Sequence, residues 1–321
     1  MPDPRVTIAV LQRESFAHTQ RSLERLYATA GAPFDLIYVD TGSPRSVRRL
    51  IDDEARRRGF RIIRRERFLT PNEARNLALA SIDTEFVAFV DNDVIFNDGW
   101  LRRLLACADE TGADLVGPLI FLDEPAFRKI HFAGGTAHIE VTESGNHLHM
   151  GHRFIDEVLS DEIAEQLRRE PSELLELHCM LVRRSVFDRT GTFDEGLRSL
   201  NEHVDFCMLA RTSGSVLMFE PEATACQLLP KLFPYDLQSL PFLFERWSRS
   251  NNRISVEHFR AKWQLAPGDP ATEATYNWSN DRRLVMLRWL RPDIAMHGVR
   301  KVNRIVESWN RRGADRAATR V

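Results

Sequence analysis

The most constraining feature of the sequence is an alternation of short apolar runs with amphipathic segments across its first 121 residues. The strand-like apolar runs lie at 5–12, 34–40, 60–66, 85–91 and 113–121. The intervening segments, 16–30, 46–59, 71–82 and 99–112, carry helical spacing of apolar residues. This alternation predicts an α/β fold, Rossmann-like, with a mostly parallel sheet and helices on both of its faces. In such sheets the ligand site lies outside the carboxyl ends of the strands.

The second half follows a less regular pattern. We expect strands at 132–141, 175–183 and 216–221 and a helix over 201–214, with "SGNHLHMGHRF" as a polar loop between the first two strands. After Pro230 the apolar and aromatic residues take helical spacing, which predicts a C-terminal helical region.

Composition excludes several classes of protein. The chain has 321 residues, 43% of them hydrophobic and 28% charged, which is typical of a soluble globular protein. No apolar run is long enough to span a membrane, and the first residues lack a secretory pattern. Four widely spaced cysteines without a C-x-x-C pair indicate reduced, mostly buried thiols, so we expect a cytoplasmic location.

The net charge of −2 conceals a basic C-terminal tail. From Arg282 to Val321 the sequence has eleven Lys or Arg against three Asp or Glu. A solvated helical face is one interpretation, and docking to an anionic surface is another. Tryptophans and aliphatic residues interleave with the basic residues, which predicts two short amphipathic helices with weak affinity for anionic membranes. We expect no nucleic-acid partner.

Two carboxylates follow a buried strand directly. The apolar run 86–90 ends on Asp91-Asn92-Asp93, and the run 34–39 ends on Asp40. Carboxylates one residue apart at the end of a strand can bind one Mg²⁺ or Mn²⁺ ion, whose remaining ligands a diphosphate would supply. Taken alone, the Asp-Asn-Asp cluster is more typical of a turn.

Six landmarks in order give this chain a strong resemblance to the inverting family 2 glycosyltransferases, which have a glycosyltransferase A-type fold. The resemblance covers roughly residues 5–228. The landmarks are "VTIAVLQRE", "FDLIYVDTGSP", "NEARNLAL", "VAFVDNDV" followed by "GWL", "MLVRRSVFDRTGTFDEGL" and "EHVDFCMLA".

The resemblance implies roles by position. Asp40 matches the carboxylate that pairs with the nucleobase, and Arg75 and Asn76 match an arginine-asparagine pair near the nucleotide. Asp91 and Asp93 match the D-x-D metal site, with Asp93 the more direct ligand. The metal, Mn²⁺ or Mg²⁺, would bridge the diphosphate of a sugar nucleotide and neutralise charge on the leaving group.

The chain departs from the family pattern at three places. The usual Pro-x-x-Asn after the first strand is replaced, so Gln12, Arg13 and Glu14 are assigned to the nucleotide pocket by position only. Gln227 stands where the family often has a histidine that ligates the metal. Glu202-His203 replaces the usual Glu-Asp, whose aspartate is the catalytic base.

The identity of the base therefore stays open between residues of one helix turn. Position nominates His203, and the positive end of a helix favours its neutral, proton-accepting form. Glu202 and Asp205 share one helical face, and His203 points about 100° away from Glu202. The face that meets the crevice decides between these three candidates.

The other histidines receive no catalytic assignment. For His147, His149 and His152 we favour a polar loop over a metal site, because no carboxylate or cysteine joins them at fixed spacing. His178, on the predicted strand 175–183, is interpreted either as an acceptor contact or as a core histidine.

These observations predict a metal-dependent inverting glycosyltransferase that moves a sugar from a nucleotide diphosphate, most plausibly UDP, to a hydroxyl. The acceptor would be a glycan, a lipid-linked molecule or a small molecule. Residues 1–229 would form the catalytic domain, with a nucleotide-sugar half at about 1–121 and an acceptor half at about 122–229, followed by the helical region 230–321. The alternatives are a catalytically silent nucleotide- or sugar-binding module and a sugar-nucleotide pyrophosphorylase.

Overall fold

The computed structural model describes residues 4–13, 15–229 and 240–288. Glu14 and the basic tail from residue 289 onward, including its predicted membrane-binding helices, lie outside the described residues. The first half has its elements in the predicted order: β1 (Val6–Leu11), α1 (Thr19–Thr29), β2 (Asp35–Thr41), α2 (Arg45–Arg58), β3 (Arg61–Arg65), α3 (Pro71–Leu79), β4 (Phe86–Asp91), β5 (Val94–Phe96), α4 (Trp100–Thr111) and β6 (Leu115–Leu122).

The second half adds shorter strands and the C-terminal helices. Its elements are β7 (Ile130–Phe132), β8 (Gly135–Thr142), β9 (Gly145–His152), α5 (Asp161–Ala164), β10 (Glu170–Pro171), β11 (Cys179–Arg183), α6 (Val186–Thr190), α7 (Glu202–Thr212), β12 (Leu217–Gln227), α8 (Leu240–Arg246), α9 (Arg249–Lys262) and α10 (Pro270–Arg288). The predicted helical region after Pro230 is thus present as α8, α9 and α10.

A single mixed sheet organises the chain, and its central strands are mainly parallel. The strand order is β10-β12-β6-β11-β4-β1-β2-β3. Strands β4, β1, β2 and β3 run parallel to one another, and β6 runs parallel to β12. β11 lies antiparallel between β4 and β6 and joins the two parallel groups. This confirms the predicted α/β class and places the carboxyl ends of β1, β2 and β4 at one edge.

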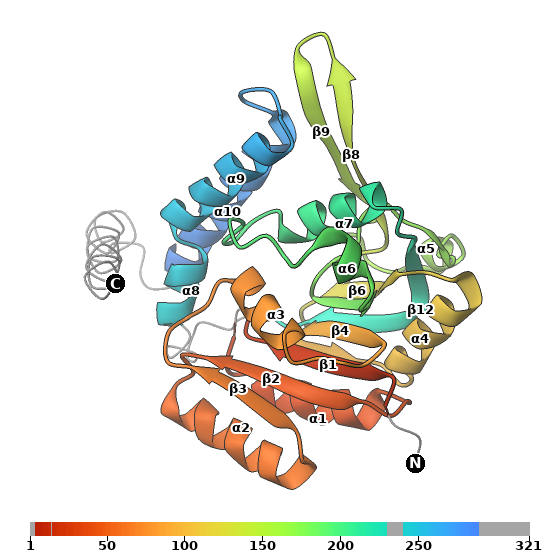
Figure 1. Cartoon of the computed structure of the whole chain (residues 1–321), viewed down its shortest axis with the longest axis vertical. Helices are drawn as coiled ribbons and strands as arrows, with labels where there is room; N and C mark the ends of the chain where they lie inside the picture. The colour runs from red at the N-terminus through yellow and green to blue at the C-terminus, as the bar shows by residue number, and fades with distance from the viewer. Residues whose placement is uncertain (1–3, 14, 230–239, 289–321) are drawn as a thin grey trace.

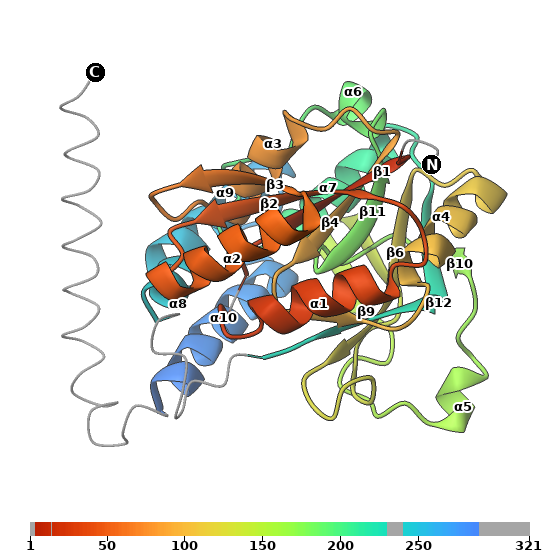
Figure 2. The same cartoon turned by 90° about the horizontal axis from the view of Figure 1, so that it is seen from below.

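Helices cover both faces of this sheet. Figures 1 and 2 show α1 and α2 on one side of β1, β2 and β3, with α3 and α7 on the other. The strands between these layers carry wholly buried apolar runs, as in β4, where all six residues are buried. Strands that are covered on both faces read as continuous apolar runs, which is why the sequence revealed them so clearly.

The histidine-rich segment that we expected to be a polar loop is a strand. β8 and β9 form a separate two-stranded antiparallel sheet, which projects from the rest of the molecule (Figure 1). Alternate residues of β9 are polar and apolar, and Leu148 is buried. The density of histidine and glycine concealed this period-2 pattern, so the polar-loop prediction was wrong.

The C-terminal helices pack closely on the region just before α7. Leu200 packs with Leu243, Trp247 and Val256 in a second apolar cluster, apart from the main core. Buried polar bonds reinforce this interface: Ser199 Oγ donates to Asn252 Oδ1 at 2.7 Å. The helices therefore help to fix the loop from which α7 begins.

Two composition-based expectations can be compared with the structure. All four cysteines are free and buried, which confirms the expected buried thiols. Within residues 4–288, apart from the two undescribed gaps, no helix combines the length and apolar character that crossing a bilayer requires.

We predict that Asn252→Ala lowers the free energy of unfolding by about 1–3 kcal/mol, because it removes one hydrogen bond from each of two buried hydroxyl groups. Asn252 is wholly buried, accepts from Ser199 Oγ and donates to Ser279 Oγ at 2.9 Å. The matched control on the same helix is Arg253→Ala, which removes only an exposed ion pair with Glu257 and should cost less than about 1 kcal/mol. Urea denaturation measures both, and equal costs would contradict the interpretation.

Candidate active site

The carboxyl ends of β1 and β2 are joined by side-chain hydrogen bonds. Gln12 Nε2 donates to Asp40 Oδ1 at 3.2 Å and to Ser43 Oγ, and Gln12 Oε1 accepts from Thr41 Oγ1 at 2.7 Å. Arg64 on β3 donates from Nε to Asp40 Oδ2 at 2.6 Å. Asp40 is wholly buried, so these donors satisfy a charge that water does not reach. The predicted pairing of Asp40 with a nucleobase stays a prediction.

Asp91 ends β4, and Asn92 and Asp93 follow it directly. The three side chains have different surroundings. Asp91 and Asp93 are 2% and 0% exposed, so both carboxylates are interior. Asn92 bonds to the loop after β1: its Oδ1 accepts from Arg13 N at 2.8 Å and its Nδ2 donates to Ser15 O at 2.9 Å. Asn92 therefore fixes the loop after β1, which brings Arg13 to the end of β4.

Asp91 has a histidine partner from the antiparallel strand. Because Cys179 pairs with Val90, His178 stands beside Asp91, and its Nδ1 lies 2.7 Å from Asp91 Oδ2. Arg13 Nε lies 3.7 Å from the same oxygen. The sequence left the role of His178 open between an acceptor contact and a core histidine. In the structure His178 is buried and bonds to Asp91, a predicted site carboxylate.

A small cavity brings four of the predicted residues together: Arg13, Arg75, Glu202 and His203. Its volume is about 10 Å³, enough for about one water molecule. The lining residues come from the loop after β1, from α3, from the segment before β11 and from α7: Arg13, Arg75, Glu176, Leu177, His178, Glu202 and His203.

Arg75 is the buried cation of this cavity. It is 1% exposed, and its Nη1 donates to Asn72 Oδ1 at 2.9 Å. Its Nε is a buried donor without a hydrogen-bond partner among the described residues. A buried guanidinium with an unused donor is a favourable place for a phosphate oxygen.

Its neighbour Asn76 is used differently. Asn76 Nδ2 donates to Phe193 O and Glu195 Oε1, both at 2.9 Å, and Asn76 Oδ1 accepts from Phe193 N at 2.9 Å. Both ends of the amide therefore hold the 193–195 segment. The nucleotide contact that the resemblance implies for Asn76 stays a prediction.

α7 begins from a strained residue. Asn201 has φ of 63°, in the left-handed region that costs a non-glycine residue energy. It is also buried. This conformation sets the direction of the first turn, which carries Glu202 and His203.

The first turn of α7 presents its side chains to different elements. Glu202 accepts from Arg246 Nη2 of α8 at 2.9 Å, with Arg13 Nη1 at 3.7 Å. Asp205 accepts from Lys262 Nζ of α9 at 2.8 Å and from Trp263 Nε1 at 2.9 Å. Both carboxylates thus face the C-terminal helices.

His203 has a different partner, although it lines the same cavity as Glu202. Its Nε2 lies 3.4 Å from Glu176 Oε1, and His152 Nε2 at the foot of β9 lies 3.9 Å from the same oxygen. Both Nε2 atoms are buried without a hydrogen-bond partner among the described residues. The ligand atoms of these three residues lie within 4.8 Å of one another.

These surroundings shift the pKa of each group. Burial opposes ionisation of Glu176, yet His203, His178, His131 and His152 outweigh it and hold its pKa well below the usual range. Burial opposes ionisation of Glu202 as well, but Arg246, Arg13 and Arg75 lower its pKa to about 2.

The pKa values of the other two candidate bases shift in opposite directions. Burial lowers the pKa of His203 below 6.5, although Glu176 opposes this. Burial raises the pKa of Asp205, against the hydrogen bond from Lys262. These pKa shifts disfavour Glu202 as a proton acceptor, and the assignment of the base to His203 stays a prediction.

The carboxylates at the end of β4 suit a hard divalent cation by their donor chemistry. Asp91 and Asp93 are two interior oxygen ligands one residue apart. Gln227 occupies the position where the family often has a metal-binding histidine. It is buried, and it pairs with Val94 in the ladder between β12 and β5. Its amide oxygen is a ligand type that Mg²⁺ and Mn²⁺ accept.

A larger cavity lies between α3 and the C-terminal helices. Its volume is about 640 Å³. Phe242 of α8 lines it and packs against Phe16 and Phe68, with ring centroids 5.7 Å and 5.2 Å away. Glu195 and Arg246 line the same cavity, and Arg246 also donates to Glu202.

Sequence reasoning missed Glu176, His152 and Arg246. The spacing Glu176-x-His178 was a usable signal, since alternate residues of an extended segment share a face. Nothing in the sequence indicated that β11 inserts beside β4, or that α8 returns to α7. Those pairings join residues far apart in the chain.

Comparison with known proteins identifies the family of the chain. The family model described as "Glycosyl transferase family 2" matches residues 7–191. The pre-mycofactocin glycosyltransferase of Mycobacterium tuberculosis is 31% identical over 153 residues, 48% of this chain and 29% of that protein. The chain spans 28–29% of the length of the curated relatives it matches.

Two solved structures share the fold. The mannosyltransferase PcManGT of Pyrobaculum calidifontis, in complex with GDP-Man and Mn²⁺, superposes with a TM-score of 0.54 at 14% identity over 93% of this chain and 80% of that one. S. aureus TarS 1–349 with UDP-GlcNAc gives 0.53 at 16% identity, over 87% and 72%. At this identity the likeness extends to the fold alone.

We predict that Glu202→Gln lowers the free energy of unfolding by about 3 kcal/mol at neutral pH, because the buried Arg246 guanidinium loses the carboxylate that neutralises it. A carboxylate whose folded pKa is depressed to about 2 stabilises fully above its unfolded pKa near 4.5 and loses that effect as pH falls toward 2. The gap between wild type and variant should therefore narrow between about pH 5 and pH 3 in urea titrations. The control is Glu257→Gln, which breaks an exposed ion pair with Arg253 on α9. A gap independent of pH would contradict the assignment.

Proposed function

The chain belongs to glycosyl transferase family 2, and from this premise we propose that it is a metal-dependent inverting glycosyltransferase. It would transfer a sugar from a nucleotide diphosphate, with UDP as the favoured nucleotide, to an acceptor hydroxyl. The fold is shared with structures that hold GDP-Man or UDP-GlcNAc, which supports a nucleotide-sugar donor but leaves the nucleotide to experiment.

One observation carries the proposal beyond family membership. The unused Nε donor of buried Arg75 lies in the same cavity as Arg13, and the carboxylates that end β4 adjoin that cavity through Arg13 and His178. Two cationic side chains beside a pair of carboxylates suit an anionic diphosphate held by a divalent cation. A site for a neutral sugar alone would not require buried guanidinium groups.

The nucleotide end would lie over the ends of β1 and β2. Gln12 and Asp40 offer amide and carboxylate groups there, and exchange of their mutual bond would let them face a base. Asp91 and Asp93 would hold Mn²⁺ or Mg²⁺, which supplies charge neutralisation for the departing diphosphate. The Mn²⁺ in the PcManGT complex supports a divalent metal.

His203 would act as the general base. Its imidazole takes the proton of the acceptor hydroxyl as that oxygen bonds to the anomeric carbon, while the bond from that carbon to the diphosphate oxygen breaks. Attack from the face opposite the leaving group inverts the configuration. Glu176 would stabilise the imidazolium that forms, because it stays anionic 3.4 Å away.

Glu202 and Asp205 would serve in other ways. The pKa of Glu202, lowered to about 2 despite burial, makes it a poor proton acceptor, and its bond to Arg246 fixes α8 against α7. Asp205 is bound by Lys262 and Trp263 on the side away from the cavity. Release of nucleoside diphosphate from candidate donors, with and without acceptors, tests the activity against a catalytically silent binding module.

We predict that Asp93→Ala abolishes Mn²⁺-dependent binding of UDP while the protein stays folded. The carboxylate is wholly buried at the end of β4, so the variant removes a metal ligand without cutting a strand bond. Calorimetric titration of UDP with and without Mn²⁺ measures the effect. Asp188→Ala, on an exposed position of α6, is the control and should bind as the wild type does. A variant at position 93 that binds UDP and Mn²⁺ normally would sink the metal assignment.

We predict that His203→Asn lowers turnover by about 10²–10⁴-fold, the usual contribution of a general base. The neutral imidazole is the active form, and its pKa lies below 6.5, so the wild-type rate should hold to that pH and fall as the pH drops further. A carboxylate base with the pKa of Glu202 would keep the rate flat below pH 4. UDP binding should barely change. If Glu202→Gln is inactive and His203→Asn retains most activity, the roles are reversed.

A further inference from the structure

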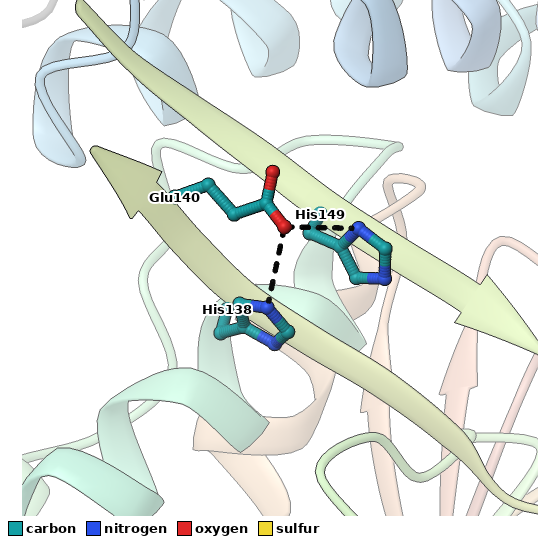
Figure 3. A group of neighbouring side chains, drawn as sticks. All are labelled: His138, Glu140 and His149. Atoms are coloured by element: carbon teal, nitrogen blue, oxygen red, sulfur yellow. Dashed lines mark ion pairs between the residues drawn. The ribbon is translucent and has the colours of Figure 1, made fainter. Parts of the chain in front are cut away.

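The β8–β9 hairpin carries a cluster of metal-binding side chains away from the candidate active site. His138 on β8 stands directly opposite His149 on β9 in the antiparallel register. Glu140 lies two residues along β8, on the same face. Figure 3 shows the three side chains on one side of the hairpin, with dashed lines from one Glu140 carboxylate oxygen to a nitrogen of each ring.

The distances suit a single cation after a small contraction. Glu140 Oε1 lies 3.9 Å from His138 Nε2 and 3.5 Å from His149 Nδ1, and the three ligand atoms lie within 4.8 Å of one another. Zinc with bonds of about 2.0–2.2 Å in a tetrahedron sets its ligand atoms roughly 3.4 Å apart. The rings are nearly parallel at 4.8 Å, and the side chains are about half exposed, so they can turn toward one ion.

A second layer of bonds already orients one ligand. His138 Nδ1 lies 2.6 Å from Glu173 Oε2, which also accepts from Ala137 N at 3.1 Å. Arg211 Nη2 donates to Glu173 Oε1 at 2.9 Å and holds that carboxylate in place. A histidine that gives its Nδ1 proton to a fixed carboxylate presents an unprotonated Nε2, as metal-bound histidines do.

We propose that His138, Glu140 and His149 bind one Zn²⁺ ion, with water in the remaining coordination position. Two imidazoles and one carboxylate favour a borderline cation such as Zn²⁺ over Mg²⁺ or Mn²⁺, which prefer oxygen ligands. The proposal is separate from the glycosyltransferase function and from the carboxylates that end β4.

The ion would connect the two strands of an otherwise independent sheet. A two-stranded hairpin is marginally stable by itself, and β8 and β9 pair only with each other as strands. The foot of β9 carries His152, 3.9 Å from Glu176. A bound ion would therefore also steady a side chain of the candidate active site.

The test is equilibrium dialysis of the tag-free, full-length protein against Zn²⁺, with bound metal measured directly. We expect one equivalent per chain on the hairpin, weakened at least tenfold in His138→Gln and in His149→Gln. Glu173→Gln should weaken it by about 10–100-fold, the usual effect of losing an outer-shell partner. His258→Gln is the matched control, since His258 is a surface histidine that pairs with one carboxylate and has no second histidine beside it. This variant should bind as the wild type does.

The buried group of His152, Glu176 and His203 offers a competing set of ligands. Zn²⁺ binding that survives His138→Gln and His149→Gln and disappears in His152→Gln would overturn the proposal. Absence of bound Zn²⁺ in the wild type at micromolar concentrations would overturn it as well. Because the readout is bound metal, either result leaves the proposed sugar transfer to stand or fall by its own assays.

Discussion

The burial of two carboxylates at the end of β4 is the constraint on which the arrangement of the site depends. Asp91 and Asp93 are almost without solvent contact, and an ionised carboxylate in that position is strongly unfavourable unless cations or donors surround it. His178 and Arg13 approach Asp91 for this reason, from β11 and from the loop after β1. The antiparallel insertion of β11 beside β4 is thus tied to the chemistry of the strand end.

The same electrostatic argument separates the residues of the first turn of α7. Glu202 and His203 are adjacent in sequence, yet one faces Arg246 and the other faces Glu176. The arginines lower the pKa of Glu202 to about 2, and burial lowers the pKa of His203. Environments that push neighbouring pKa values apart are how a site assigns acid, base and structural roles. The helical spacing of about 100° between consecutive residues makes this division possible.

The sequence predicted the half of the molecule in which local patterns determine structure. Every strand and helix up to Leu122 was expected except β5, whose three residues follow Asp93 directly, because buried parallel strands and amphipathic helices have distinct periods. The grouping of Arg13, Arg75, Glu202 and His203 in one cavity also followed from the family pattern. By contrast, Arg246 and Lys262 reach α7 from helices after Pro230, through packing that no local pattern records. Position in the family pattern places Asn76 near the nucleotide, which stays a prediction, whereas the sequence did not indicate that its amide bonds to the 193–195 segment.

The hairpin shows why its histidines were hard to interpret as a sequence. Alternate residues of a strand face opposite sides, so His149 and His152, three apart, cannot lie on one face. His149 meets His138 and Glu140 on the outside, and His152 reaches Glu176 on the inside. A search for ligands at fixed spacing within one segment misses both groups, because each is completed by carboxylates from another strand or loop. Because the side chains of a strand alternate in direction, the two faces of the hairpin have different surroundings. A ligand or a substitution can change the surface face, and the other face borders the candidate base.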